Sequence, residues 1–219
     1  MTTEKDIEIV WWKVAIIERF SSVLYPLDSL ELLRQLPTIG YVVPELALTV
    51  RTDSNKPIAQ KGDIELVMNQ DNKTIGVVGR SIEKTIGSFE ELRKFYSERL
   101  DPSSGLATQY IEFDGDGWAK SGSSPIASFA SFWSDFASFE ALGGIVGSDV
   151  VDFGVHLAPV NRDPNSPEWL HVIIEPLIPS ATSRYRLKYV LRSADTEQLL
   201  KKFASIEDTV RRMIKKIEG

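Results

Sequence analysis

The alternation of apolar and polar positions predicts strands in the N-terminal half. The run from Ile7 to Phe20 is rich in β-branched and aromatic residues, which favours one long strand over a helix. Two shorter alternating runs flank the turn residues Asp71-Asn72 and predict a hairpin in which Met68 faces Ile75. A further strand is expected over 42–51, starting near a sheet edge because Pro44 cannot donate a backbone hydrogen bond.

Helix-capping patterns place two helices among these strands. Asp28 with Glu31 forms a capping box, and the helix that follows is expected to end at Pro37. A second capping box begins at Ser88, and its helix is expected to continue to Leu100.

The C-terminal half has the same order of patterns. Strands are predicted over 109–113, 149–158, 168–178 and 184–193. Ser124-Pro125 predicts the start of one helix, which should stop at Gly143, and Asp195 caps a last helix extending to about Glu218. The segment from Asp114 to Gly117 has the composition of a tight turn.

These elements predict an α+β protein made of two similar halves. Each half has the order strand, helix, three strands, helix, with an antiparallel sheet and helices on one side. The halves span 1–100 and 109–219, with a linker over 101–108, and one continuous domain is the alternative. The order resembles that of the TATA-binding-protein-like fold class, an analogy of element order that implies no function.

A second resemblance rests on the segment 63–118. It contains a hairpin over 64–80, a short capped helix beginning Ser88-Phe89-Glu90, and the strand Tyr110-Ile111-Glu112-Phe113. This order is similar to that of an uncharacterised protein family found sporadically in bacteria and archaea. The resemblance implies a similar fold and supplies no catalytic residues.

Pairing the last three strands as an antiparallel meander predicts one polar sheet face. Matching Val155 with Val172 and Ile174 with Leu187 keeps apolar residues opposite apolar residues. The opposite face then carries a row of charged groups and both histidines, with His156 beside His171 and Glu175 beside both Asp152 and Arg186. This row consists of Asp152, His156, His171, Glu175 and Arg186.

The polar row has a plain interpretation and two functional ones. The plain one is a solvated face whose ion pairs each contribute about 0–1 kcal/mol. The first functional one is a metal- or small-molecule-dependent enzyme that uses His156, His171, Glu175 and Arg186, with the two histidines as possible metal ligands. The second is anion or nucleic-acid binding by a basic strand comprising Arg184, Arg186, Lys188 and Arg192.

Composition and charge narrow these choices. The net charge of −6 disfavours binding to a polyanion. The chain has no cysteine, which excludes disulfides and thiolate metal sites and fits a reducing cytoplasm. No membrane span is expected, because Gly, Asp and His interrupt the longest apolar runs. No signal peptide is expected, because the N-terminus lacks a positive segment followed by an apolar one.

The leading hypothesis is therefore a non-enzymatic interaction protein that forms a homodimer and needs no cofactor. Trp11 and Trp12 are neighbours on the first strand, so their side chains should point to opposite faces. One should be buried, and the other is the candidate interface residue because tryptophan is enriched at interfaces.

Overall fold

The computed structural model describes residues 7–21, 29–45, 57–99, 108–133, 145, 152–160, 163–178 and 183–219. The first half contains β1 (Glu8–Phe20), α1 (Ser29–Gln35), the 3-10 helix η2 (Leu36–Ile39), β2 (Ala59–Lys61), β3 (Ile64–Asn69), β4 (Thr74–Gly79) and α3 (Ile82–Arg99). The second half contains β5 (Thr108–Lys120), α4 (Pro125–Phe132), β6 (Val155–Leu157), β7 (Trp169–Pro176), β8 (Arg184–Ser193), α6 (Thr196–Ala204) and α7 (Ile206–Glu218).

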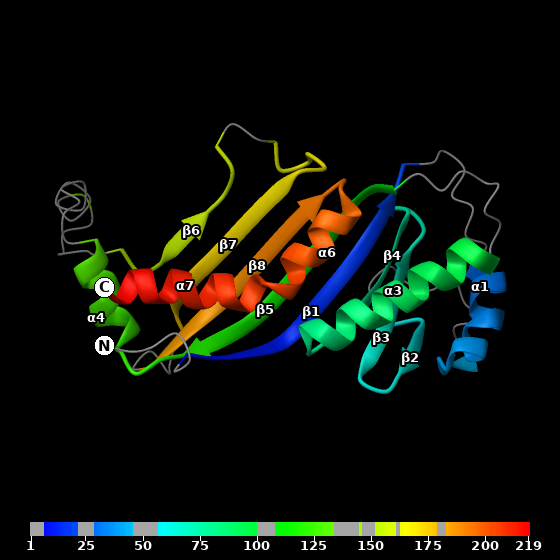
Figure 1. Cartoon of the computed structure of the whole chain (residues 1–219), viewed down its shortest axis with the longest axis horizontal. Helices are drawn as coiled ribbons and strands as arrows, with labels where there is room; N and C mark the ends of the chain where they lie inside the picture. Colours follow the sequence, from blue (N-terminus) through cyan, green and yellow to red (C-terminus); the bar gives the residue numbers. More distant parts are fainter. Residues whose placement is uncertain are drawn as a thin grey trace.

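All eight strands belong to one antiparallel sheet with the order β2-β3-β4-β1-β5-β8-β7-β6 (Figure 1). The long strands β1 and β5 lie at its centre and join the two halves. Counting outward from β1, the order is 1-4-3-2, and counting outward from β5 it is 5-8-7-6. The predicted α+β class with an antiparallel sheet is therefore confirmed, and the two halves share one sheet.

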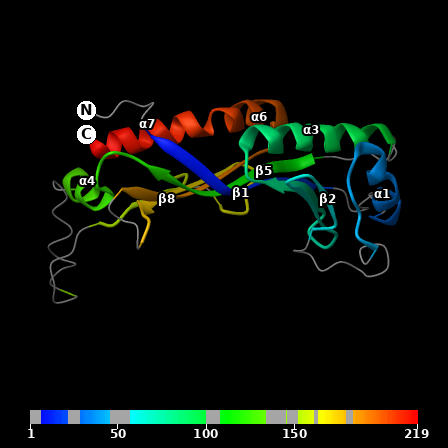
Figure 2. The same ribbon diagram turned by 90° about the horizontal axis from the view of Figure 1, so that it is seen from below.

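The helices α3, α6 and α7 form a layer on one side of this sheet (Figure 2). The inward side chains of the central strands are buried against that layer. The ring centroid of Phe113 in β5 lies 5.1 Å from that of Phe203 in α6 and 6.2 Å from that of Trp11 in β1. Burial of these large apolar side chains is the main force that holds the two layers together. Within the described ranges, no helix combines the length and apolar character needed to cross a bilayer.

Several of the predicted elements and registers are confirmed. The first strand spans thirteen residues within the predicted run, and β8 has the predicted bounds. Met68 pairs with Ile75 in the β3–β4 hairpin, and Ile174 pairs with Leu187 between β7 and β8. Asp195 caps α6 by accepting a hydrogen bond from the backbone N–H of Gln198 at 3.0 Å. In each case an alternating pattern or a local cap is sufficient to determine the geometry.

The predicted turn at Asp114 to Gly117 is wrong, because these residues lie inside β5. A Cβ atom on Gly117 would lie 2.5 Å from the backbone oxygen of Val10, and one on Gly115 would lie 2.9 Å from the Trp11 ring. Both positions therefore require glycine, because β1 and the Trp11 ring approach β5 closely there. In the sequence, glycines used in this way look the same as the glycines of a turn.

Two predicted helix boundaries are also wrong. The third helix begins at Ile82, so Ser88 lies in its interior; the side chain that accepts a hydrogen bond from the first turn is that of Ser81. The last helix is broken at Ser205, which ends α6 and precedes α7. Figure 1 shows α6 and α7 running in different directions on either side of this break.

Other predictions fall wholly or partly outside the described residues. Of the strand expected over 42–51, the described part forms one isolated bridge between Val42 and Gln60. The cap Asp28, the helix stop at Gly143 and the linker up to residue 107 are not described, and Thr108 begins β5.

Candidate functional site

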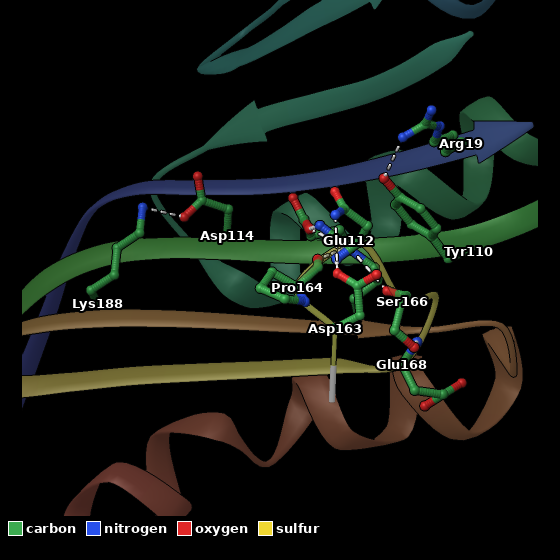
Figure 3. A network of polar contacts seen from close by, with 11 residues as sticks. Arg19, Tyr110, Glu112, Asp114, Asp163, Pro164, Ser166, Glu168 and Lys188 are labelled. Atoms are coloured by element: carbon green, nitrogen blue, oxygen red, sulfur yellow. Dashed lines mark hydrogen bonds and ion pairs between the residues drawn. The ribbon is translucent and has the colours of Figure 1, made fainter. Parts of the chain in front are cut away.

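The sheet face opposite the helix layer, called the open face below, bears a dense network of ion pairs (Figure 3). Its centre is Asp114 in β5, whose two carboxylate oxygens lie 3.0 Å from Lys13 Nζ and 2.5 Å from Lys188 Nζ. Lys188 Nζ also lies 3.1 Å from Asp116. These contacts link β1, β5 and β8, the three central strands of the sheet.

The network shifts the pKa values of its members in opposite directions. Burial raises the pKa of Asp114, but hydrogen bonds and charges from Lys188 and Lys13 outweigh burial and lower it below the usual value. Burial lowers the pKa of Lys188, but Asp114 and Asp116 outweigh burial and raise it. Each group therefore stabilises the charged form of its partner, which is the behaviour of a structural ion pair.

A second part of the network surrounds Arg192 in β8. Its guanidinium contacts the Glu112 carboxylate at 2.5 Å and donates hydrogen bonds to the backbone oxygens of Pro164 and Ser166. The same guanidinium lies 4.4 Å from the centre of the Tyr110 ring, and Arg19 donates a hydrogen bond of 3.2 Å to the Tyr110 hydroxyl. In Figure 3, Glu112 lies over β5 close to Pro164 and Ser166, with Tyr110 and Arg19 to one side.

The predicted row of histidines does not form, because the register of β6 differs by two residues from the prediction. His156 pairs with Ile173, and Val155 pairs with Ile174. His156 Nε2 instead lies 3.7 Å from the Glu175 carboxylate, which also accepts a hydrogen bond of 3.0 Å from Arg186. A shift by two residues leaves every side chain on the same face, so the alternation of apolar residues could not detect it.

The predicted neighbours Glu175 and Arg186 do pair, whereas Asp152 and His171 lie apart from them. The Asp152 carboxylate accepts a hydrogen bond from the Gly154 backbone N–H at 3.0 Å, while Gly154 itself packs against Glu175. His171 pairs with Val190 in β8. Within the described ranges, no three His, Cys, Asp or Glu side chains are grouped as a metal site requires.

Three of the four cations on the predicted basic strand are neutralised by carboxylates. Arg186 contacts Glu175, Lys188 contacts two aspartates, and Arg192 contacts Glu112. Arg184 is the exception, and its guanidinium stacks on the Trp118 ring at 4.5 Å. The strand therefore presents little uncompensated positive charge to a phosphate.

A buried carboxylate that the sequence analysis did not consider lies on the helix side of the sheet. Glu18 is 1% exposed and accepts hydrogen bonds from the Tyr96 hydroxyl and, at 2.5 Å, the Thr108 hydroxyl, while Arg93 lies 3.4 Å away. Burial and the adjacent Glu18 charge raise the pKa of Tyr96. The cluster lines a cavity of about 410 Å³ beneath α3 and α6. The sequence signal for this cluster was Glu18 itself, a single carboxylate among the otherwise apolar inward positions of β1.

The two tryptophans of β1 have different environments. Trp11 is 5% exposed, and its indole N–H donates a hydrogen bond of 3.2 Å to Glu207 in α7. Trp12 is 43% exposed at a β-bulge that the register shift between Trp11 and Lys13 creates. The predicted split between one buried and one exposed tryptophan therefore holds in the structure.

Trp12 lies on a part of β1 that has a strand on only one side. Along its whole length β1 pairs with β5, but the pairing with β4 covers Val14–Arg19 alone. No described strand pairs with the other side of Glu8–Lys13, which is called the free edge below. In the second half, β8 is the counterpart of β4, and it pairs with β5 as far as Lys120. The free edge therefore arises because β4 is shorter than β8.

Two hollows flank the free edge. The helix-side pocket, about 700 Å³, is bounded by Ile9, Trp11 and residues of α3 and α7. The open-face pocket, about 360 Å³, is bounded by Trp12, Lys13 and residues of β3 and β4. Arg80, at the turn from β4 into α3, lines both. The free edge is thus accessible from both faces of the sheet.

Comparison with protein-family models found no family that matches this chain, and comparison with curated proteins found no match.

Proposed function

We propose that this chain is a non-enzymatic interaction protein that self-associates as a homodimer in the cytoplasm, with the free edge of β1 as its contact surface. The observation that carries this proposal is the single-sided pairing of Glu8–Lys13 in the middle of an otherwise paired sheet. Unpaired backbone N–H and C=O groups on a strand form a ready template for another chain.

The side chains at the free edge support the same function. Val10 is 36% exposed and Trp12 is 43% exposed, and both lie at this edge. Strand edges that avoid association commonly carry a free lysine or a proline. Here the stretch Glu8–Trp12 contains neither residue, and the Lys13 ammonium is bound to Asp114 at 3.0 Å.

The open face supports a binding role better than catalysis or anion binding. Its central acids and bases are matched with one another, and this matching consumes the charge that would be needed to bind a phosphate. The separation of His156 from His171 further reduces support for a metal-dependent enzyme. The matching strand orders of the two halves favour a duplicated, TATA-binding-protein-like arrangement without indicating a nucleic-acid ligand.

Native mass spectrometry of the purified protein tests self-association. We expect a dimer for the unmodified chain and a monomer for Trp12→Glu, because the substitution replaces the large exposed apolar side chain of each free edge with a carboxylate. The matched control is Ile126→Glu, since Ile126 is 45% exposed on α4, which packs against α7 and β7, and it lines neither hollow at the free edge. The control should remain dimeric.

Two results would contradict the proposal. A monomeric unmodified chain at micromolar concentration would exclude self-association. A dimer that survives Trp12→Glu but dissociates with Ile126→Glu would place the contact elsewhere on the molecule.

A further inference from the structure

We propose that the two copies pair as antiparallel strands along their free edges, with Val10 on the two-fold axis, so that the two sheets become continuous. This inference rests on the proposed self-association and adds the partner segment and its register. We choose a second copy as the partner of the free edge because a two-fold contact needs a surface that is complementary to itself. The register and charges described next give the free edge this property.

The length and chemistry of the free edge favour this register. About a two-fold axis, the residue on the axis faces its own copy, and an axis at Val10 pairs the whole stretch Glu8–Trp12 with itself. An axis at Glu8 would place two carboxylates opposite each other. An axis at Trp12 would run the partner strand into β4, which begins its pairing at Val14.

The contact that results is apolar at its centre. Val10 is the cross-strand partner of Trp118, and directly paired residues share a face, so Val10 projects to the open face. Self-pairing at Val10 brings two half-exposed valines together and covers them with the exposed Trp12 of each copy. The central contact therefore removes the two large apolar side chains of each free edge from water.

Charges at the ends of the free edge are complementary in this register. Glu8 of one copy lies opposite Trp12 of the other, and Trp12 shares the open-face pocket with Arg80. Neither Glu8 nor Arg80 has an ion-pair partner among the described residues of its own chain. Each copy thus brings an exposed carboxylate towards an exposed guanidinium of the other, and symmetry produces this pair twice.

Single-cysteine cross-linking provides a direct test, because the chain has no cysteine of its own. A residue on the axis of an antiparallel pair has its own copy about 4.5–5.5 Å away between Cα atoms, which is within disulfide range. We expect Val10→Cys to give a covalent dimer under mild oxidation on a non-reducing gel. Ile126→Cys, with similar exposure on α4, should remain a single chain.

A charge exchange tests the register independently and does not require a disulfide. Glu8→Lys alone and Arg80→Glu alone should each weaken the dimer by several-fold in dissociation constant. The double variant Glu8→Lys/Arg80→Glu should restore much of the affinity, because the opposite charges meet again. Restoration would not occur if the single substitutions merely disturbed folding.

The outcomes separate this inference from the proposal on which it rests. A monomeric unmodified chain overturns both. A native dimer that neither cross-links through Val10→Cys nor recovers in the charge exchange overturns the strand pairing and leaves self-association standing. A co-purified extended peptide seen by native mass spectrometry, with displacement of the second copy, would overturn the second copy as the partner of the free edge.

Discussion

At the scale of single residues, the buried carboxylate of Glu18 defines the polar contact between the sheet and α3. A buried carboxylate is strongly unfavourable unless it is hydrogen-bonded or paired with a charge. Glu18 meets this condition through Tyr96, Thr108 and Arg93, which come from three different segments of the chain. The cluster therefore depends on the correct placement of α3 and of the start of β5 relative to β1.

Replacing Tyr96 by Phe should destabilise the fold by about 1–3 kcal/mol, because it removes a donor from a buried carboxylate. The matched control is Tyr41→Phe. Both tyrosines are 2% exposed, but the Tyr41 hydroxyl has no hydrogen-bond partner among the described residues. The control should be neutral or slightly stabilising. Urea unfolding monitored by circular dichroism measures both, and equal losses would argue against a specific role for the Tyr96 hydroxyl.

At the scale of elements, the close approach of β1 and β5 determines which residues β5 can contain. Its inward positions Ile111 and Phe113 hold large buried side chains, yet the inward positions Gly115 and Gly117 hold none. The Trp11 ring occupies the space above them. A small residue in one strand is therefore matched to a large residue in its neighbour, as in other tightly packed sheets.

Gly117→Ala should destabilise the protein by about 1–3 kcal/mol, because the added methyl group would overpack against Val10 and Trp11. Gly87→Ala should have the opposite sign. Gly87 lies inside α3 with nothing within 4 Å of a built Cβ, and alanine stabilises a helix interior by about 0.5–1 kcal/mol. Thermal unfolding of both variants would measure this pair of effects. A destabilised Gly87→Ala variant would contradict the expected difference.

At the scale of the whole molecule, the ion pairs of the open face connect the two halves of the sheet. Asp114 in β5 contacts Lys13 of the first half and Lys188 of the second half. Because the ion pairs lower its pKa in the folded state, Asp114 contributes stability above the ordinary aspartate pKa. That contribution is lost as the pH falls through the folded pKa, where the carboxylate becomes protonated.

Asp114→Asn should therefore lower the unfolding temperature at pH 7, and the gap between variant and unmodified protein should narrow as the pH falls below about 4. The control is Asp71→Asn, because Asp71 is exposed in the β3–β4 turn and has no ion pair among the described residues. Calorimetry between pH 3 and pH 7 measures the difference. A constant gap over this range would show that the loss at Asp114 is not electrostatic.

The sequence alone determined the features that depend on neighbouring residues. The β-branched and aromatic content predicted β1, and alternation predicted the β3–β4 register and the pairing of Ile174 with Leu187. The Asp195 side chain predicted the cap of α6. These patterns reflect which face of a strand is buried, or which side chain accepts hydrogen bonds from the backbone N–H groups of the first helical turn. Both are local requirements and can be recognised without a partner segment.

Tertiary structure alone decided the features that depend on two distant segments. The register of β6 differs by two residues from the predicted one without changing the face on which each side chain lies. The glycines of β5 owe their identity to Trp11, about a hundred positions away. The free edge of β1 exists because β4 stops at Gly79 while β1 continues to Glu8. A strand's own sequence does not record where its neighbour ends, so only the folded sheet reveals this surface.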